Sequence, residues 1–237
     1  MKRNLLLISN STLYGRGYLD HCADEIKKLL DNKKTVLFIP YARPSGLTHK
    51  KYTKIAKDCI NKMGFELKGI NEYTDPKIAV EQADSIFIGG GNTFVLLKEL
   101  YESGIMDLIK IRVERGMPYI GTSAGSNVAC KSIMTTNDMP ITYPPSFKAL
   151  ELVPFNINPH YLDPDPNSKH MGETRETRIR EFHFFNQDYV VGLREGSMLL
   201  VKDDNITLKG STGARVFKNN KEPLEIKPGE KLDFLLK

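Results

Sequence analysis

Apolar residues in the first half of the chain form short continuous runs that alternate with longer segments of helical spacing. The short runs predict strands buried on both faces, and the longer segments predict amphipathic helices. Alternating strands and helices predict an α/β fold with a mostly parallel, twisted sheet flanked by helices. The predicted strands are residues 5–8, 35–40, 65–70, 85–88 and 118–122, and the predicted helices are residues 18–30, 51–63, a short helix from 75 and a helix around 94–100.

The second half of the chain is less regular. Residues 138–165 contain six prolines and little periodicity, and a long irregular segment in a compact domain is usually functional. A helix near 174–185, a strand at 190–193 and several short strands with Asn and Gly turns are predicted after it. We find no linker and no repeat, so residues 1–237 are expected to form a single domain with extra short strands near its C-terminus.

Composition and charge narrow the function classes. Hydrophobic residues make up 40% and charged residues 27%, as in ordinary soluble globular proteins. The net charge of +5 comes from dispersed lysines, and no apolar run reaches membrane-spanning length, so neither a nucleic-acid partner nor a membrane partner is expected. The three cysteines have no C-x-x-C spacing, which predicts reduced thiols and no metal site. The N-terminal apolar run is too short for a signal peptide, so the expected location is the cytoplasm.

A candidate nucleophile follows the fifth predicted strand directly. Residues 121–125 read Gly-Thr-Ser-Ala-Gly and match G-x-S-x-G, with a helix-compatible segment after them. In this strand–turn–helix context the motif exposes a serine hydroxyl at the carboxyl edge of a sheet. Ser123 is therefore the candidate nucleophile, and the alternative is an ordinary serine that caps a helix.

A nucleophilic serine needs a general base, and the chain has five histidines. His160 lies in the proline-rich segment, where restricted backbone can aim an imidazole, so it is the candidate base. His183 lies among phenylalanines, which favours a packed core residue. The others are interpreted as bystanders: His21 in a helix, His49 in a solvated lysine-rich segment and His170 in a loop.

The imidazole needs a carboxylate that fixes its tautomer, and two acids are candidates. Glu195 follows a predicted strand and Asp138 lies in the proline-rich segment, although either can be an ordinary turn acid. The developing oxyanion needs donors, which the backbone N–H groups of Gly90, Gly91 and Ala124 can supply. The run 89–91 fits neither G-x-G-x-x-G nor the P-loop, so a nucleotide site is not expected.

Several segments in this order resemble the peptidase E family of α-aspartyl dipeptidases, serine peptidases whose family also includes cyanophycinase. The resemblance covers nearly the whole chain. It implies hydrolysis of dipeptides with an N-terminal aspartate, a fold similar to the class I glutamine amidotransferases (flavodoxin-like) with serine in place of cysteine, and no cofactor. The segments that carry it are residues 7–13, 89–94, 123–125, 135–140, 157–160 and 172–176.

The resemblance also implies roles for the candidate triad. Ser123 matches the family's nucleophile, His160 its general base and Glu195 the acid of a Ser-His-Glu triad. Asp138 matches a second acid that matters in the family and stays an alternative partner for the histidine. We favour Glu195, because a position just beyond a strand holds a side chain rigidly.

Recognition of an N-terminal aspartate requires a fixed cation, and arginine binds a carboxylate through two parallel hydrogen bonds. Arg175 matches the family's motif arginine, and Arg178, three residues on along the same helical face, is the second candidate. Residues 162–168 differ most from the family pattern, which leaves the fine specificity open.

Two other functions share these features. One is an isoaspartyl or cyanophycinase-like peptidase, which would use the same nucleophile motif. The other is a non-catalytic protein that binds a small molecule on the same scaffold, since a fold does not determine a function. The expected partner is a small peptide substrate, and the chain is expected to be a monomer or a homodimer.

Overall fold

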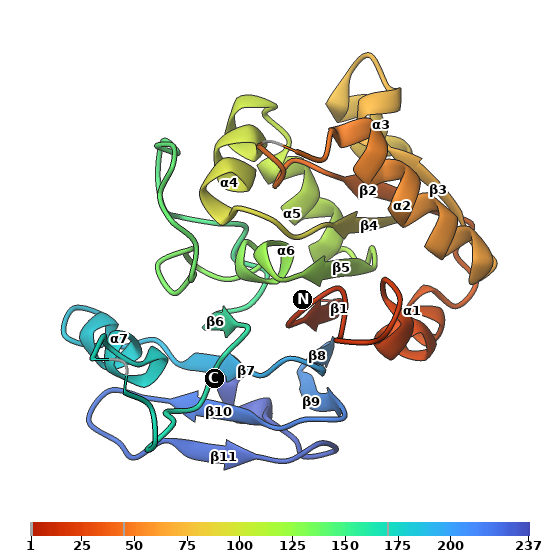
Figure 1. Cartoon of the computed structure of the whole chain (residues 1–237). Helices are drawn as coiled ribbons and strands as arrows, with labels where there is room; N and C mark the ends of the chain where they lie inside the picture. Colours follow the sequence, from red (N-terminus) through yellow and green to blue (C-terminus); the bar gives the residue numbers. More distant parts are fainter. Residues whose placement is uncertain (1, 45, 170) are drawn as a thin grey trace.

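The computed structural model describes residues 2–44, 46–169 and 171–237, and within them the chain forms two β-sheets, of which the larger carries most of the helices (Figure 1). Five strands of the larger sheet run parallel, and its last two strands continue it in antiparallel pairing. Its seven strands have the order β3 (Glu66–Gly69), β2 (Thr35–Ile39), β4 (Ser85–Ile88), β5 (Tyr119–Thr122), β1 (Asn4–Ile8), β8 (Ser197–Lys202) and β9 (Asn205–Gly210).

Helices cover both faces of the parallel strands. Side chains of β1 alternate between two buried clusters: Leu5 and Leu7 contribute to one, and Leu6 and Ile8 to the other. Because both faces are covered, β1, β2, β4 and β5 have no polar face, which explains their continuous apolar sequences, whereas the edge strand β3 alternates exposed and buried residues. The first cluster includes α3 (Pro76–Gln82), α4 (Thr93–Glu102) and α5 (Met106–Glu114), and the second includes α1 (Ala23–Leu30) and α2 (His49–Lys62).

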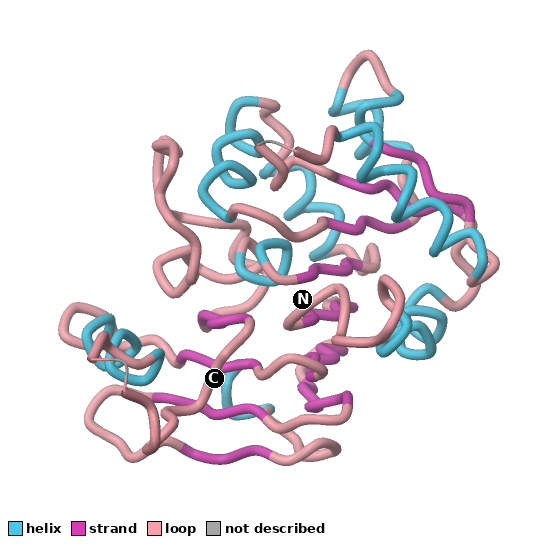
Figure 2. Tube along the Cα trace, viewed as in Figure 1, coloured by secondary structure: helices cyan, strands magenta, loops and turns pink. Residues whose placement is uncertain are grey.

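A smaller sheet, seen below the larger one in Figure 2, contains the later strands of the chain. Its order is β11 (Leu224–Ile226), β10 (Ala214–Phe217), β7 (Val190–Leu193) and β6 (Asn156–Pro159). The helix α7 (Arg175–Phe182) packs on it through Ile179. Ile157 and Val191 belong to the same buried cluster as Leu5, so one apolar interior joins the two sheets.

The described residues also form several short helices. α6 (Ala124–Asn127) follows β5 directly, and single 3₁₀ turns occur at Asp20–Cys22, Ile70–Glu72 and Asp233–Leu236. In the described part of the chain, no helix combines the length and apolarity needed to cross a bilayer.

The predicted α/β fold with a mostly parallel sheet is confirmed, and two helix starts differ from the prediction. The helix predicted from residue 18 begins only at Ala23, because Leu19 has a left-handed backbone (φ 62°) that a helix cannot contain. The helix predicted from residue 51 begins earlier, at His49, because the Thr48 hydroxyl accepts a hydrogen bond from the Lys51 N–H at 3.2 Å and caps it.

Two elements were not predicted from the sequence. β6 lies inside the proline-rich segment and forms the edge of the smaller sheet, beside β7, where a proline such as Pro159 is tolerated. α5 buries Ile109 and Val113 but leaves Ile111 exposed, which blurs its apolar stripe.

Candidate active site

The carboxyl ends of β4, β5 and β1 meet at one edge of the larger sheet, where sites of α/β proteins usually lie. β4 ends at the glycine run 89–91, β5 at Ser123, and β1 at Ser9. The parallel strands β6 and β7 of the smaller sheet bring His160 and Glu195 to the same place. The site therefore lies where the two sheets meet.

Ser123 occupies a strained turn between β5 and α6. Its backbone has φ 52° and ψ −110°, a conformation that costs a non-glycine residue roughly 1–3 kcal/mol. A Cβ on Gly121 would lie 2.5 Å from the Gly125 carbonyl oxygen, and a Cβ on Gly125 would lie 2.1 Å from the Ile88 carbonyl oxygen. Both glycines are therefore required sterically, which explains the G-x-S-x-G pattern.

Ser123, His160 and Glu195 form one hydrogen-bonded line. The His160 Nε2 atom lies 3.0 Å from the Ser123 Oγ, and its Nδ1 atom lies 2.6 Å from the Glu195 Oε1. A carboxylate can only accept, so Nδ1 carries the hydrogen and Nε2 is left to accept from the serine hydroxyl. The side chains of His160 and Glu195 are 41% and 50% exposed, which leaves the line open to a ligand.

Asp138, the alternative acid, lies elsewhere. Its Oδ2 accepts hydrogen bonds from the Thr93 N–H at 2.8 Å, the Thr93 hydroxyl at 2.6 Å and the Thr136 hydroxyl at 3.2 Å. Of the two candidate acids, the structure thus places Glu195, and not Asp138, at the ring nitrogen remote from Ser123.

Ser9 and Asn10 follow β1, and the sequence pattern assigns them no role. They form hydrogen bonds to the backbone of the segments that carry His160 and Glu195. The Ser9 hydroxyl accepts from the His160 N–H at 2.9 Å and donates to the Leu193 carbonyl at 2.7 Å. The Asn10 side-chain oxygen accepts from the Gly196 N–H at 2.9 Å. His160 has a left-handed backbone (φ 52°), so these bonds stabilise a conformation that is unfavourable by itself. Their only sequence signal is two polar residues at the end of a buried strand.

Arg194 also joins the two segments that carry His160 and Glu195. Its guanidinium donates two parallel hydrogen bonds to Asp163, both 2.7 Å, and two more to Glu225, at 2.5 and 3.0 Å. These partners, Asp163 first, raise the pKa of Arg194 far above its usual value. Asp163 follows His160 by three residues and Arg194 precedes Glu195, so this ion cluster fixes both segments relative to the smaller sheet.

The glycine run lies against Ser123, the candidate nucleophile. A Cβ on Gly90 would lie 3.0 Å from the Ser123 Cβ, and a Cβ on Gly91 (φ 148°) would lie 2.2 Å from the Ala42 carbonyl oxygen. Across the described ranges, no hydrogen bond uses the N–H of Gly90, Gly91 or Ala124. These three donors are therefore available to a ligand oxygen near Ser123.

Arg175 begins α7 and has no ion-pair partner among the residues described. Burial lowers its pKa, the neighbouring Arg178 lowers it further, and Asp138 acts in the opposite direction. Arg178 is exposed and lies 3.9 Å from Glu173, a weak ion pair. Both arginines line a small cavity of about 40 Å³ that Thr136 also lines.

The other histidines that the structure describes do not join this line. His183 is 5% exposed and its Nε2 bonds the Asp188 carbonyl at 3.0 Å, as expected for a core residue. His21 lies in the 3₁₀ turn before α1 and His49 begins α2. His170 lies outside the described residues.

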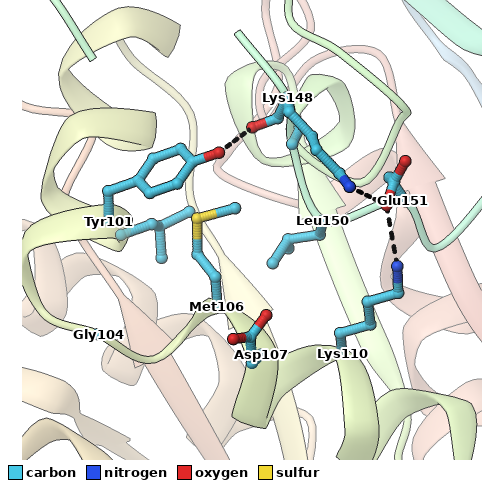
Figure 3. Close-up of a pocket in the computed structure, with 10 residues that line it drawn as sticks. Tyr101, Gly104, Met106, Asp107, Lys110, Lys148, Leu150 and Glu151 are labelled. Atoms are coloured by element: carbon cyan, nitrogen blue, oxygen red, sulfur yellow. Dashed lines mark hydrogen bonds and ion pairs between the residues drawn. The ribbon is translucent and has the colours of Figure 1, made fainter. Parts of the chain in front are cut away.

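A separate cavity of about 310 Å³ lies between α4, α5 and the segment 148–151 (Figure 3). Its charges compensate one another, since Glu151 lies 3.0 Å from the Lys110 Nζ and 3.2 Å from the Lys148 Nζ. Tyr101 donates to the Lys148 carbonyl at 2.9 Å. The two lysines of this cavity are therefore paired with the same glutamate within the protein.

The fold and this arrangement define the class: an α/β protein whose site has the geometry of a serine hydrolase. The model of peptidase family S51 matches residues 5–209, and the chain belongs to that family. It is 49% identical over 237 residues to a Drosophila melanogaster protein named probable alpha-aspartyl dipeptidase, with 99% of this chain and 98% of that protein covered. It is 48% identical over 233 residues to a peptidase E of Streptomyces coelicolor, covering 98% and 95%.

The fold is also similar to a solved structure. A peptidase from an acI-B1 Actinobacterium superposes with a TM-score of 0.75 at 17% identity, covering 98% of this chain and 97% of that one. The resemblance noted in the sequence is thus confirmed at the level of family and fold.

Gly125→Ala tests the steric requirement at the turn. Because the new Cβ would meet the Ile88 carbonyl, the backbone of Ser123 must shift, and we expect peptidase kcat/KM to fall at least about 100-fold. Gly64→Ala is the control: it has a positive φ of 99° but open space around it, so it should lower stability by about 1 kcal/mol and leave kcat/KM unchanged. Thermal melts and initial rates measure both, and an active Gly125→Ala enzyme would contradict the steric argument.

Proposed function

We propose that this chain is a serine exopeptidase that hydrolyses dipeptides with an N-terminal aspartate (Asp-Xaa) through an acyl-enzyme intermediate. The observation that carries the proposal is the line from Ser123 through His160 to Glu195, and it is joined by the cation of Arg175, which has no ion-pair partner among the described residues. The relatives named alpha-aspartyl dipeptidase and peptidase E support the choice of substrate.

In the first half of the reaction, the Ser123 Oγ attacks the scissile carbonyl carbon of the aspartyl residue. His160 Nε2 takes the hydroxyl proton, and the C–N bond then breaks as the same nitrogen returns that proton to the leaving amine of Xaa. In the second half, His160 removes a proton from water, the hydroxide attacks the acyl carbon, and aspartate is released as the proton returns to Ser123 Oγ.

Backbone donors and Glu195 stabilise the charges that develop. The N–H groups of Gly90, Gly91 and Ala124 are free to bind the oxyanion of the tetrahedral intermediate. The Glu195 carboxylate, 2.6 Å from Nδ1, keeps the imidazole in the useful tautomer and stabilises the imidazolium.

Arg175 is the proposed partner of the aspartyl side-chain carboxylate, with Arg178 as the second candidate. Arg175 is the better buried of the two and has no ion-pair partner in the described part of the chain, whereas Arg178 is exposed and lies 3.9 Å from Glu173. A half-buried, unpaired guanidinium disfavours any ligand that leaves it unpaired, so asparagine should be a poor replacement for aspartate. Glutamate should also be poor, because one more methylene moves either its carboxylate or its scissile carbonyl out of place.

The remaining features of the proposal follow from the whole chain. We place the enzyme in the cytoplasm, as a single domain over residues 1–237, acting as a monomer or homodimer on small peptides without a cofactor. The dispersed lysines support no nucleic-acid partner, and we propose no membrane partner.

The linkage specificity is tested by comparing α-Asp-Leu with β-Asp-Leu, using Ser123→Ala as the blank. The wild type should release leucine faster from the α-linked peptide, and Ser123→Ala should lose nearly all turnover because no other hydroxyl replaces the nucleophile. Ser103→Ala, at the end of α4, should keep the wild-type rate. Faster cleavage of the β-linked peptide would support the isoaspartyl, cyanophycinase-like alternative. Full activity of Ser123→Ala would show that Ser123 is not the nucleophile.

Glu195→Gln tests the acid. An amide cannot stabilise the imidazolium, so we expect kcat to fall by about 10²- to 10³-fold with little change in KM. Glu173→Gln, an exposed acid on the segment before α7, should leave kcat unchanged. A Glu195→Gln enzyme within threefold of the wild-type kcat would refute the assignment.

Arg175→Met tests substrate recognition, and Arg178→Met is its matched control on the same helix. Loss of the carboxylate's partner should raise the activation free energy for Asp-Leu by about 2 to 5 kcal/mol and reduce the preference for Asp-Leu over Asn-Leu. Arg178→Met should change the same ratio far less. If Arg175→Met keeps the wild-type preference for Asp-Leu over Asn-Leu while Arg178→Met loses it, Arg178 is the residue that binds the aspartyl side chain.

A further inference from the structure

Asp138 lies between two parts of the candidate active site. On one side it accepts from Thr93, two residues after Gly91 of the glycine run. On the other side its neighbour Asn137 donates to the carbonyl of Pro159, the residue before His160, at 2.6 Å. Asp138 is therefore held between the segment beside the oxyanion donors and the segment that carries the base.

Only one of its two carboxylate oxygens is used. Oδ2 accepts from the Thr93 N–H, the Thr93 hydroxyl and the Thr136 hydroxyl, and the two hydroxyls are themselves 3.0 Å apart. Across the described residues, no donor is bonded to Oδ1. The orientation of the carboxylate is thus fixed while half of its accepting capacity remains open, which is the form expected of a binding group rather than of a helix cap alone.

The cation of Arg175 does not neutralise this carboxylate. Arg175 is close enough for Asp138 to influence its pKa, yet no ion pair joins the two side chains. Elsewhere in the smaller sheet, Arg194 and Arg215 are each paired with carboxylates at 2.7 Å. A cation and an anion that lie near each other without pairing suit a ligand that itself carries both charges.

We propose that the Asp138 carboxylate binds the α-ammonium group of the substrate, so that Asp138 and Arg175 together recognise the zwitterionic head of an N-terminal aspartate. The inference rests on the proposed function and deepens it, because it assigns the residue that binds the free amino terminus of the substrate. The α-ammonium group is bonded to the carbon next to the scissile carbonyl, and the side-chain carboxylate is one carbon further. Opposite charges on adjacent carbons match opposite charges on the two sides of the site.

This assignment explains why such an enzyme would act only at a free amino terminus. An α-amino group has a pKa of about 7.7–8.0 and is mostly protonated at neutral pH, but it loses its charge when it is acylated within a longer chain. An uncharged group at this position would leave the Asp138 Oδ1 desolvated and unpaired, which is costly. Aspartate inside a protein would therefore be rejected on electrostatic grounds as well as by its bulk.

The experiment compares Asp-Leu with N-succinyl-leucine, which is Asp-Leu without its α-amino group and adds no atoms. The wild type should favour Asp-Leu by at least about 100-fold in kcat/KM. Asp138→Asn should lower kcat/KM for Asp-Leu by about 100-fold but lower that for N-succinyl-leucine far less, so that the ratio collapses. Glu195→Gln and Arg175→Met should lower both substrates by similar factors, because both substrates share the scissile bond and the side-chain carboxylate.

Several results would overturn the inference. If the wild type cleaves N-succinyl-leucine with a kcat/KM within threefold of that for Asp-Leu, the inference is wrong. This comparison needs no variant, so it holds even if Asp138→Asn fails to fold. Equal losses on both substrates in Asp138→Asn would show that the residue only supports the fold. Thr136→Val, which removes one donor to Oδ2 but keeps the carboxylate, should preserve the substrate ratio. Failure of the wild type to cleave Asp-Leu at all would instead refute the proposed function itself.

Discussion

The close approach of two backbones at the ends of β4 and β5 is the constraint on which the rest of the site depends. The Ile88 carbonyl lies so near Gly125 that no side chain fits there, and Gly121 faces the same turn from the other side. The Tyr119 hydroxyl bonds the Gly125 carbonyl at 2.6 Å, and the Ser126 hydroxyl bonds the Ile8 and Gly121 carbonyls at 2.7 and 2.8 Å. Buried bonds of this kind keep Ser123 in its strained backbone and beside Gly90. The cost of the strain is offset by packing that a flexible loop could not supply.

The distribution of charge separates supporting residues from residues available to a ligand. Arg194 binds two carboxylates, and Arg215 binds Glu176 at 2.7 Å, so their charges are satisfied within the protein. Arg175 and one oxygen of Asp138 lack such partners within residues 2–44, 46–169 and 171–237. A half-buried charge without a partner is unfavourable, which supports the proposal that a charged ligand completes the pairing of Arg175 and Asp138.

The nucleophile turn could be predicted from the sequence because its requirements are local. A buried strand, two obligatory glycines and a serine lie within a few residues, and steric contact alone explains the pattern. The choice of acid could not be predicted in the same way. Whether Glu195 or Asp138 reaches His160 depends on β6 pairing with β7, and β6 lies in a proline-rich segment without strand periodicity. The roles of Ser9 and Asn10 could not be predicted from the sequence either, because their partners are more than 150 residues away along the chain.

The dependence of the line on two sheets has a mechanical consequence. Ser123 belongs to the larger sheet, whereas His160 and Glu195 follow strands of the smaller one. Their distances are therefore determined by how the sheets are joined, through the shared apolar interior and through the Ser9 hydroxyl, which is fully buried and bonds both the His160 N–H and the Leu193 carbonyl. Because a packed interior resists sliding, the nucleophile and base stay in register without any contact from a ligand. Under the proposed assignment, substrate binding energy serves recognition by Asp138 and Arg175 rather than assembly of the line.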